Sequence, residues 1–242
     1  VEPSTTGTIE WAGLGLILTY VFIPQPSLTL RMIVAIVFAM IGTLIFFAFL
    51  QRVALKSSLV VPIVGLMLGA VVGAVSTFVA LQTDMLQNLG IWFAGSFTGV
   101  TRGRYELLWI VAATTILVYF IADRFTVAGL GQEIATSVGL NYRAVMIVGI
   151  SIVAVTTGVV SVVVGSLPFL GLVVPNIVSM FRGDNLRSNL PWVVMVGIVV
   201  ITLTDIIGRT IIMPFEIPVS MILGVLGATV FVYLIVRKGR RG

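Results

Sequence analysis

The sequence predicts an all-α integral membrane protein, built as a bundle of transmembrane helices. Two observations of composition predict this class. Hydrophobic residues make up 59% of the 242 residues and charged residues only 10%, and the mean hydropathy is +1.19. Such a chain has too few polar side chains to cover a soluble globule. A third observation agrees with this class: the uncharged stretches of the chain reach the ~20 residues that a helix needs to cross a bilayer.

The residue types that are missing exclude several kinds of site. The chain contains no cysteine and no histidine, which excludes disulfides, thiolate or imidazole metal sites and Ser-His-Asp catalysis. Lys and Arg number 14 against 9 Asp and Glu, but basic residues beside apolar spans are what membrane orientation requires. We therefore expect no metal site, no catalytic residue and no nucleic-acid partner, and a lipid bilayer as the surroundings.

Four spans are expected in the first half of the chain, over residues 8–23, 32–50, 59–81 and 107–122. Between the third and the fourth lies a connector that is too polar to span. It carries Trp92 and Phe93, whose side chains suit the headgroup level. The third span contains a ladder of small residues, Gly65, Gly69 and Gly73. Such a ladder is typical of close helix packing, although a role in lining a transport path also stays open.

Two further spans are expected in the uncharged run 144–181. This run is roughly twice as long as the ~20 residues of one crossing, so it must cross twice. The break is expected at 165–171, GSLPFLG, where Pro168 can open the next helix at its first position. The last two spans are expected over 191–212 and 218–236.

The basic residues predict the orientation of these eight spans. Most of them fall on one side: Arg52, Lys56, Arg124, Arg143, Arg182, Arg187, Arg237, Lys238, Arg240 and Arg241. Only Arg31, Arg102, Arg104 and Arg209 fall on the other. The positive-inside rule makes the first side cytoplasmic. The polar loop 129–143 is then cytoplasmic, and the corner 213–218 is external.

The cytoplasmic loop contains a short amphipathic helix. Its apolar residues, Ile134, Ala135, Val138 and Leu140, can form one stripe, with Gln132, Glu133, Thr136 and Ser137 facing outward. Such a helix can fit a groove of a partner protein. The alternative, an ordinary interfacial loop helix, stays open on the residues alone.

Three blocks in this order carry a resemblance: residues 129–143, 165–191 and 204–238. They resemble the FecCD-type permeases of binding-protein-dependent importers for iron-siderophores, vitamin B12 and haem, over essentially the whole chain. Within that family the chain looks most like permeases for catecholate siderophores such as petrobactin. The family fold has about ten transmembrane helices. The resemblance therefore implies that residues 1–242 are a single permease domain of the type II importer kind, truncated at the N-terminus by two helices.

The resemblance also implies which residues meet an ATPase. In the family, a loop of this type forms the coupling helices that sit in a cleft of the ATPase subunit. The matching residues are Gly131, Gln132, Glu133, Ala135, Gly139 and Leu140. The common version has an acidic residue directly after the second Gly, whereas this chain has Gln132 and then Glu133.

Two more sites follow from the resemblance. Arg209, with Glu216 seven residues later, matches an external family arginine that pairs with a carboxylate of the substrate-binding protein. An ion pair with Asp205, four residues earlier, is the alternative. Ser57 and Ser58 match small hydroxyl residues that narrow the path at a cytoplasmic gate, and helix capping by Ser58 is the alternative there.

The expected function is transport of a ferric siderophore, with the catecholate type favoured, by ATP-driven alternating access. The chain lacks a G-x-x-x-x-G-K-[ST] run, so ATP and Mg²⁺ are expected on a separate ATPase subunit. This chain itself is expected to be no enzyme and to bind no cofactor. Its expected partners are that ATPase, a second permease subunit and an extracytoplasmic binding protein, at a bacterial cytoplasmic (inner) membrane. Vitamin B12 or haem import, an ion-coupled secondary transporter and a membrane scaffold are the alternatives.

Overall fold

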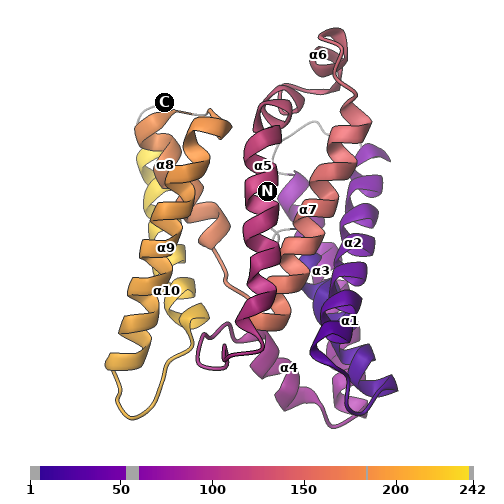
Figure 1. The fold of residues 1–242 in the computed structure, drawn as a ribbon, viewed down its shortest axis with the longest axis vertical. Helices are drawn as coiled ribbons and strands as arrows, with labels where there is room; N and C mark the ends of the chain where they lie inside the picture. Colours follow the sequence, from indigo (N-terminus) through magenta and orange to yellow (C-terminus); the bar gives the residue numbers. More distant parts are fainter. Residues whose placement is uncertain (1–5, 53–59, 184, 240–242) are drawn as a thin grey trace.

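The computed structural model describes residues 6–52, 60–183 and 185–239, which are predominantly helical (Figure 1). The first helices along the chain are α1 (Thr8–Phe22), α2 (Leu28–Arg52), α3 (Val60–Gln82) and α4 (Leu86–Phe93). A short 3₁₀ helix, η2 (Tyr105–Leu107), precedes α5 (Leu108–Ala128), α6 (Gln132–Ser137) and α7 (Tyr142–Val163). The remaining helices are α8 (Leu170–Arg182), α9 (Leu186–Thr210) and α10 (Val219–Gly239).

Five of the described helices are long and apolar enough to cross a membrane, and they lie at α2, α3, α5, α7 and α9. Three shorter apolar helices accompany them, within α1, α8 and α10. The chain is therefore an all-α, multi-pass membrane protein, as the sequence predicts. Helix α8 has 13 residues and spans only about 20 Å at 1.5 Å per residue, short of the ~30 Å apolar core of a bilayer. The non-helical segment 164–169 joins it to the end of α7.

The helices form two groups (Figure 1). Helix α2 packs against both α1 and α7, and α5 packs against α7, whereas α8, α9 and α10 pack against one another. The described helices of the two groups meet mainly where α5 contacts α9. Small residues permit the closest approaches in the first group. A Cβ built on Gly158 of α7 would lie 2.6 Å from Cγ1 and 2.8 Å from Cα of Ile36 on α2.

The glycine ladder of the third span has two environments. A Cβ on Gly69 would lie 3.1 Å from Cα of Gly7, so here α3 approaches the start of α1 backbone to backbone. Gly7 has a φ of 74°, a left-handed conformation that glycine adopts without steric cost. A Cβ on Gly73 would meet nothing within 4 Å. The packing interpretation is therefore confirmed at Gly69 and does not extend to Gly73.

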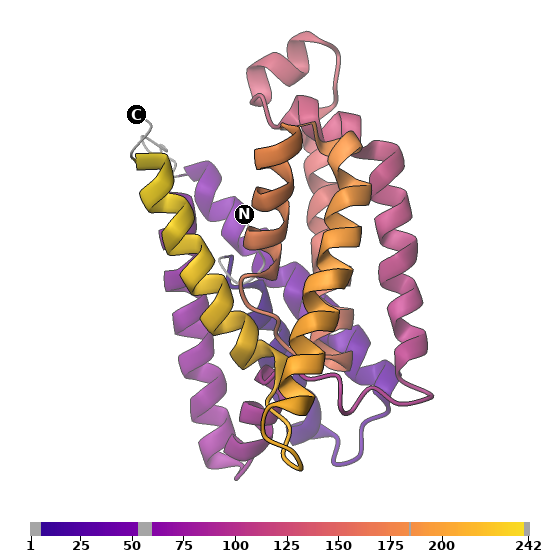
Figure 2. The ribbon, with the colours of Figure 1, turned by 90° about the vertical axis from the view of Figure 1, so that its left-hand side faces the viewer.

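The two ends of the bundle agree with the predicted topology. Helix α6 and the turn between α8 and α9 lie at the same end of the bundle as the last turn of α10 (Figure 1). Helix α4 and the loop between α9 and α10 lie at the opposite end (Figure 2). The basic residues of α5, α7 and α8 thus gather at the α6 end, which we call the cytoplasmic end in accordance with the positive-inside rule.

Several boundaries differ from those predicted. Helix α8 begins at Leu170, not at Pro168, because Phe169 precedes it in a left-handed conformation with a φ of 63°. Helix α9 begins at Leu186, not at Pro191, because the Asn185 side chain accepts a hydrogen bond from the Ser188 amide and caps the earlier start. Pro191 therefore lies inside α9. Helix α5 continues to Ala128, six residues beyond the predicted end of its apolar run.

The orientation can be tested with single cysteines, because the native chain has none. Val138 at the cytoplasmic end and Phe215 at the opposite end are both well exposed. In intact right-side-out vesicles, we expect a membrane-impermeant maleimide to label Phe215→Cys at once and Val138→Cys only after permeabilisation. Mass spectrometry measures the labelling, and the reverse pattern would place the 129–143 loop outside the cell.

Candidate functional site

The cytoplasmic loop owes its shape to two glycines. Helix α6 is bounded by Gly131 with a φ of 106° and Gly139 with a φ of 82°, conformations that side chains with a Cβ rarely adopt. At its end the Leu140 amide donates to the Ala135 carbonyl at 2.9 Å, and the Gly139 amide donates to the Thr136 carbonyl at 3.0 Å. These bonds close the helix with a left-handed glycine. Gly131 and Gly139 therefore position this loop.

The predicted apolar stripe divides into two parts. Ala135 is fully buried, and Leu140 is half-buried, so these two attach the loop to the bundle. Ile134 and Val138 instead remain 50% and 66% exposed, beside Leu130 at 61%. A six-residue helix has room for one inward position only, which is why the stripe does not pack as a unit. We call the three exposed side chains, Leu130, Ile134 and Val138, the apolar knob.

The polar residues of the loop surround the apolar knob. Gln132, Glu133 and Thr136 are all exposed. Helix α6 projects beyond the ends of α5 and α7 (Figure 1). The loop thus presents apolar side chains and one carboxylate away from the bundle, which is the arrangement that a groove of a soluble partner recognises.

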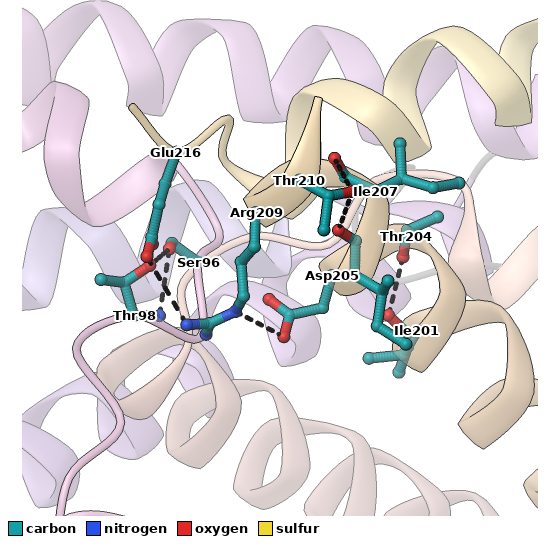
Figure 3. Close-up of polar contacts among 10 residues, drawn as sticks. Ser96, Thr98, Ile201, Thr204, Asp205, Ile207, Arg209, Thr210 and Glu216 are labelled. Carbon is teal, nitrogen blue, oxygen red and sulfur yellow. Dashed lines mark hydrogen bonds and ion pairs between the residues drawn. The ribbon is translucent and has the colours of Figure 1, made fainter. Parts of the chain in front are cut away.

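The external end carries a network of charged groups around Arg209 (Figure 3). Its Nε lies 2.9 Å from Oδ2 of Asp205, one turn earlier on α9. Its Nη1 lies 3.6 Å from Oε1 of Glu216, in the loop between α9 and α10. The intrahelical pair that the sequence offers as an alternative is therefore formed. The Arg209 side chain is still 41% exposed, so it also remains accessible from outside.

Glu216 extends this network to the connector between α4 and η2. Its Oε2 accepts a hydrogen bond from the Thr98 hydroxyl. The Ser96 hydroxyl donates to Oγ1 of Thr98 at 3.0 Å and accepts from the Thr98 amide at 3.2 Å. Figure 3 shows these three side chains lying together beside the guanidinium group of Arg209. Reasoning from the sequence missed Ser96 and Thr98, because no local pattern relates them to Glu216.

A second ion pair joins the two helix groups at the cytoplasmic end. Nη1 of Arg187, at the start of α9, lies 2.6 Å from Oδ2 of Asp123, near the end of α5. Its guanidinium carbon also lies 5.5 Å from the ring centroid of Tyr119. These side chains are about half exposed, so the pair orients α9 against α5 more than it stabilises the fold.

The predicted gate residues, Ser57 and Ser58, lie outside the residues that the structure describes. Their role as a cytoplasmic gate stays a prediction. The same holds for the alternative of helix capping by Ser58.

Comparison with known proteins identifies the family. The model of the FecCD transport family matches residues 1–237. The petrobactin import system permease protein FatD of Bacillus anthracis is 57% identical over 98% of this chain and 71% of the relative. YclN of Bacillus subtilis, a petrobactin import system permease protein, is 42% identical over 98% of this chain and 75% of the relative. The ferric-anguibactin permease protein FatD of Vibrio anguillarum is 35% identical over 99% and 76%.

A solved structure supports the fold. An inward-facing conformation of a metal-chelate type ABC transporter superposes with a TM-score of 0.83, at 22% identity, over 98% of this chain and 76% of that one. The two proteins therefore share their helical arrangement, and at this sequence identity the similarity shows the fold alone. Taken with the family match over nearly every residue and the close relatives, the conclusion is that this chain belongs to the FecCD transport family.

Proposed function

We propose that this chain is the transmembrane permease subunit of an ABC importer that carries a ferric siderophore, of the catecholate type, across the bacterial cytoplasmic membrane. The observation that carries this proposal is the 57% identity, over 98% of the chain, to a permease protein named for petrobactin import. The second relative bears the same name at 42% identity. A multi-pass helical bundle with a projecting cytoplasmic loop suits a transport subunit that is driven by a soluble partner at the cytoplasmic end.

The proposed motor is a separate ATPase subunit. The apolar knob, Gln132 and Glu133 form the surface that enters a cleft of that subunit. Gly131, Ala135, Gly139 and Leu140 hold the loop of the permease in shape. ATP and Mg²⁺ bind to the ATPase, and this chain binds no cofactor of its own. A second permease subunit, identical or homologous, completes the path. Closure of two ATPases draws two such loops together, and alternating access follows.

The proposed docking site for the extracytoplasmic binding protein is Arg209 with Glu216. Arginine offers five N–H donors, and in the described network only Nε lies at hydrogen-bond distance from a carboxylate. The edge of the guanidinium formed by Nη1 and Nη2 remains for a carboxylate of the binding protein, which an arginine can bind through two parallel hydrogen bonds.

Reversing the charge of Arg209 tests this docking site. For Arg209→Glu we expect the affinity of the loaded binding protein to fall about tenfold or more, since a favourable charge pair becomes a repulsive one. Assembly with the ATPase is expected to be unchanged. Biolayer interferometry on nanodiscs measures the affinity, and Arg102→Glu on the same external side serves as the control with a smaller loss. Undiminished affinity would leave Arg209 with a structural role only.

Uptake measurements test the function as a whole. Proteoliposomes that hold the permease and its ATPase are expected to accumulate radioactive iron from ferric petrobactin only when ATP is inside and the loaded binding protein outside. Parallel assays with cobalamin and haem identify the substrate class within the family. Accumulation without ATP, driven by an ion gradient, would instead support a secondary transporter and contradict the proposal.

A further inference from the structure

We propose that Thr98 and Glu216 are positioning residues that transmit docking at Arg209 to the non-helical break before α8. This inference rests on the proposed function, since it assumes that a binding protein docks at the external end. It adds a mechanical link between that surface and the transport path. The link consists of one short stretch of the connector, residues 95–98, which touches both the docking network and the break.

The connector stretch is attached to the break through backbone groups. The Ser96 amide donates to the Val164 carbonyl at 2.9 Å. Gly95 is so close to the break that an added Cβ would lie 2.1 Å from the Ser166 carbonyl oxygen. Gly165, with a φ of 96°, also lies against Gly95, since an added Cβ on Gly165 would lie 3.0 Å from Cα of Gly95. With backbone against backbone there is no flexible side chain to absorb a displacement.

The same stretch also holds the start of α10. The Ser220 amide donates to the Gly95 carbonyl at 3.0 Å. Further along α10, a Cβ on Gly227 would lie 2.4 Å from Cβ of Phe169, the residue before α8. Residues 95–98 are thus in contact with the end of α7, the break and α10. A non-helical segment at membrane depth is tolerated where it is buried in protein or lines a cavity, and discontinuous helices of this kind form the substrate sites of many transporters.

The docking network is connected to this stretch by Glu216. One carboxylate oxygen faces Arg209 at 3.6 Å, longer than a hydrogen bond, and the other accepts from the Thr98 hydroxyl. When a carboxylate of the docking protein binds the guanidinium through two hydrogen bonds, it neutralises the positive charge that attracts Glu216. The negative charge of that carboxylate also repels Glu216. Glu216 then moves relative to Arg209. Its bond to Thr98 carries that movement to the connector and, through Ser96, to the break at Val164.

The Thr98 hydroxyl bond is exposed, so its removal is expected to leave the fold intact. Thr98→Val keeps the size and branching of the side chain and deletes only the hydroxyl. Thr101→Val is the matched control, since Thr101 is an exposed threonine of the same connector whose hydroxyl takes no part in the described network. Both variants are tested as the full permease and ATPase complex in nanodiscs, with the binding protein loaded with ferric petrobactin.

In the unaltered complex we expect the loaded binding protein to stimulate ATP hydrolysis and to change amide exchange at residues 164–167. With Thr98→Val, binding affinity and basal hydrolysis are expected to stay within about twofold, while the stimulation falls about fivefold or more, which is the usual size of coupling between two sites. The exchange response at 164–167 is expected to be lost. Thr101→Val is expected to match the unaltered complex in every respect.

Two results would overturn the inference. One is a Thr98→Val complex with full stimulation and an unchanged exchange response at 164–167. The other is a loss of affinity in Thr98→Val as large as that in Arg209→Glu, because Thr98 would then belong to the docking surface itself. Absence of binding to the unaltered complex is a different outcome, which would contradict the proposed function rather than the link alone.

Discussion

Replacing Ile134 and Val138 together by aspartate is expected to abolish assembly with the ATPase while the permease remains folded. Both side chains are exposed in the isolated chain, at 50% and 66%, so neither supports the bundle. Full burial of one such side chain in an interface contributes about 1.5–3 kcal/mol to the free energy of binding. The double substitution removes two anchors and buries two charges, so we expect a loss of more than about 3 kcal/mol, or over ~100-fold in affinity.

Co-purification with the ATPase measures this effect. The matched control exchanges the two side chains, Ile134→Val with Val138→Ile, and keeps the apolar surface. We expect the control to retain assembly and Glu133→Arg to weaken it, since Glu133 is exposed beside Ile134. Normal assembly of the double aspartate variant would show that the ATPase binds elsewhere on the chain.

Replacing Gly158 by alanine is expected to lower the stability of the bundle strongly, although only one methyl group is added. The new Cβ would lie 2.6 Å from Cγ1, 2.8 Å from Cα and 2.8 Å from N of Ile36. Two of these three atoms belong to the α2 backbone, so no rotamer change removes the clash. Overpacking of this kind costs about 1–3 kcal/mol, and Gly158→Leu is expected to cost more.

Thermal unfolding in detergent or nanodiscs measures this loss. Gly197→Ala on α9 is the matched control, because a Cβ there would meet nothing within 4 Å. Both changes replace a helical glycine by alanine and gain the same helix propensity. We therefore expect Gly197→Ala to be neutral or slightly stabilising. Equal melting temperatures for the two variants would contradict the close α2 to α7 contact.

The ends of helices could be predicted from the sequence wherever a proline or the end of an apolar run marks them. The first span was predicted over 8–23 and is observed at Thr8–Phe22, since Pro24 and Pro26 end it. The third was predicted over 59–81 and is observed at Val60–Gln82. Boundaries set by single side-chain contacts were wrong, as at Leu186, where the Asn185 cap starts α9 five residues before Pro191.

What the sequence by itself determined is the membrane class, the order of the helices, the loop that carries α6 and the end of the bundle at which most of the described charges lie. These follow from apolar length, glycine and proline positions and charge asymmetry, which are all local properties. Only the tertiary structure decided which face of the loop stays exposed and that Glu216 bonds to Thr98, far apart in the chain. Contacts of that kind depend on how rigid helices pack against one another, and no residue pattern within a single segment encodes that packing.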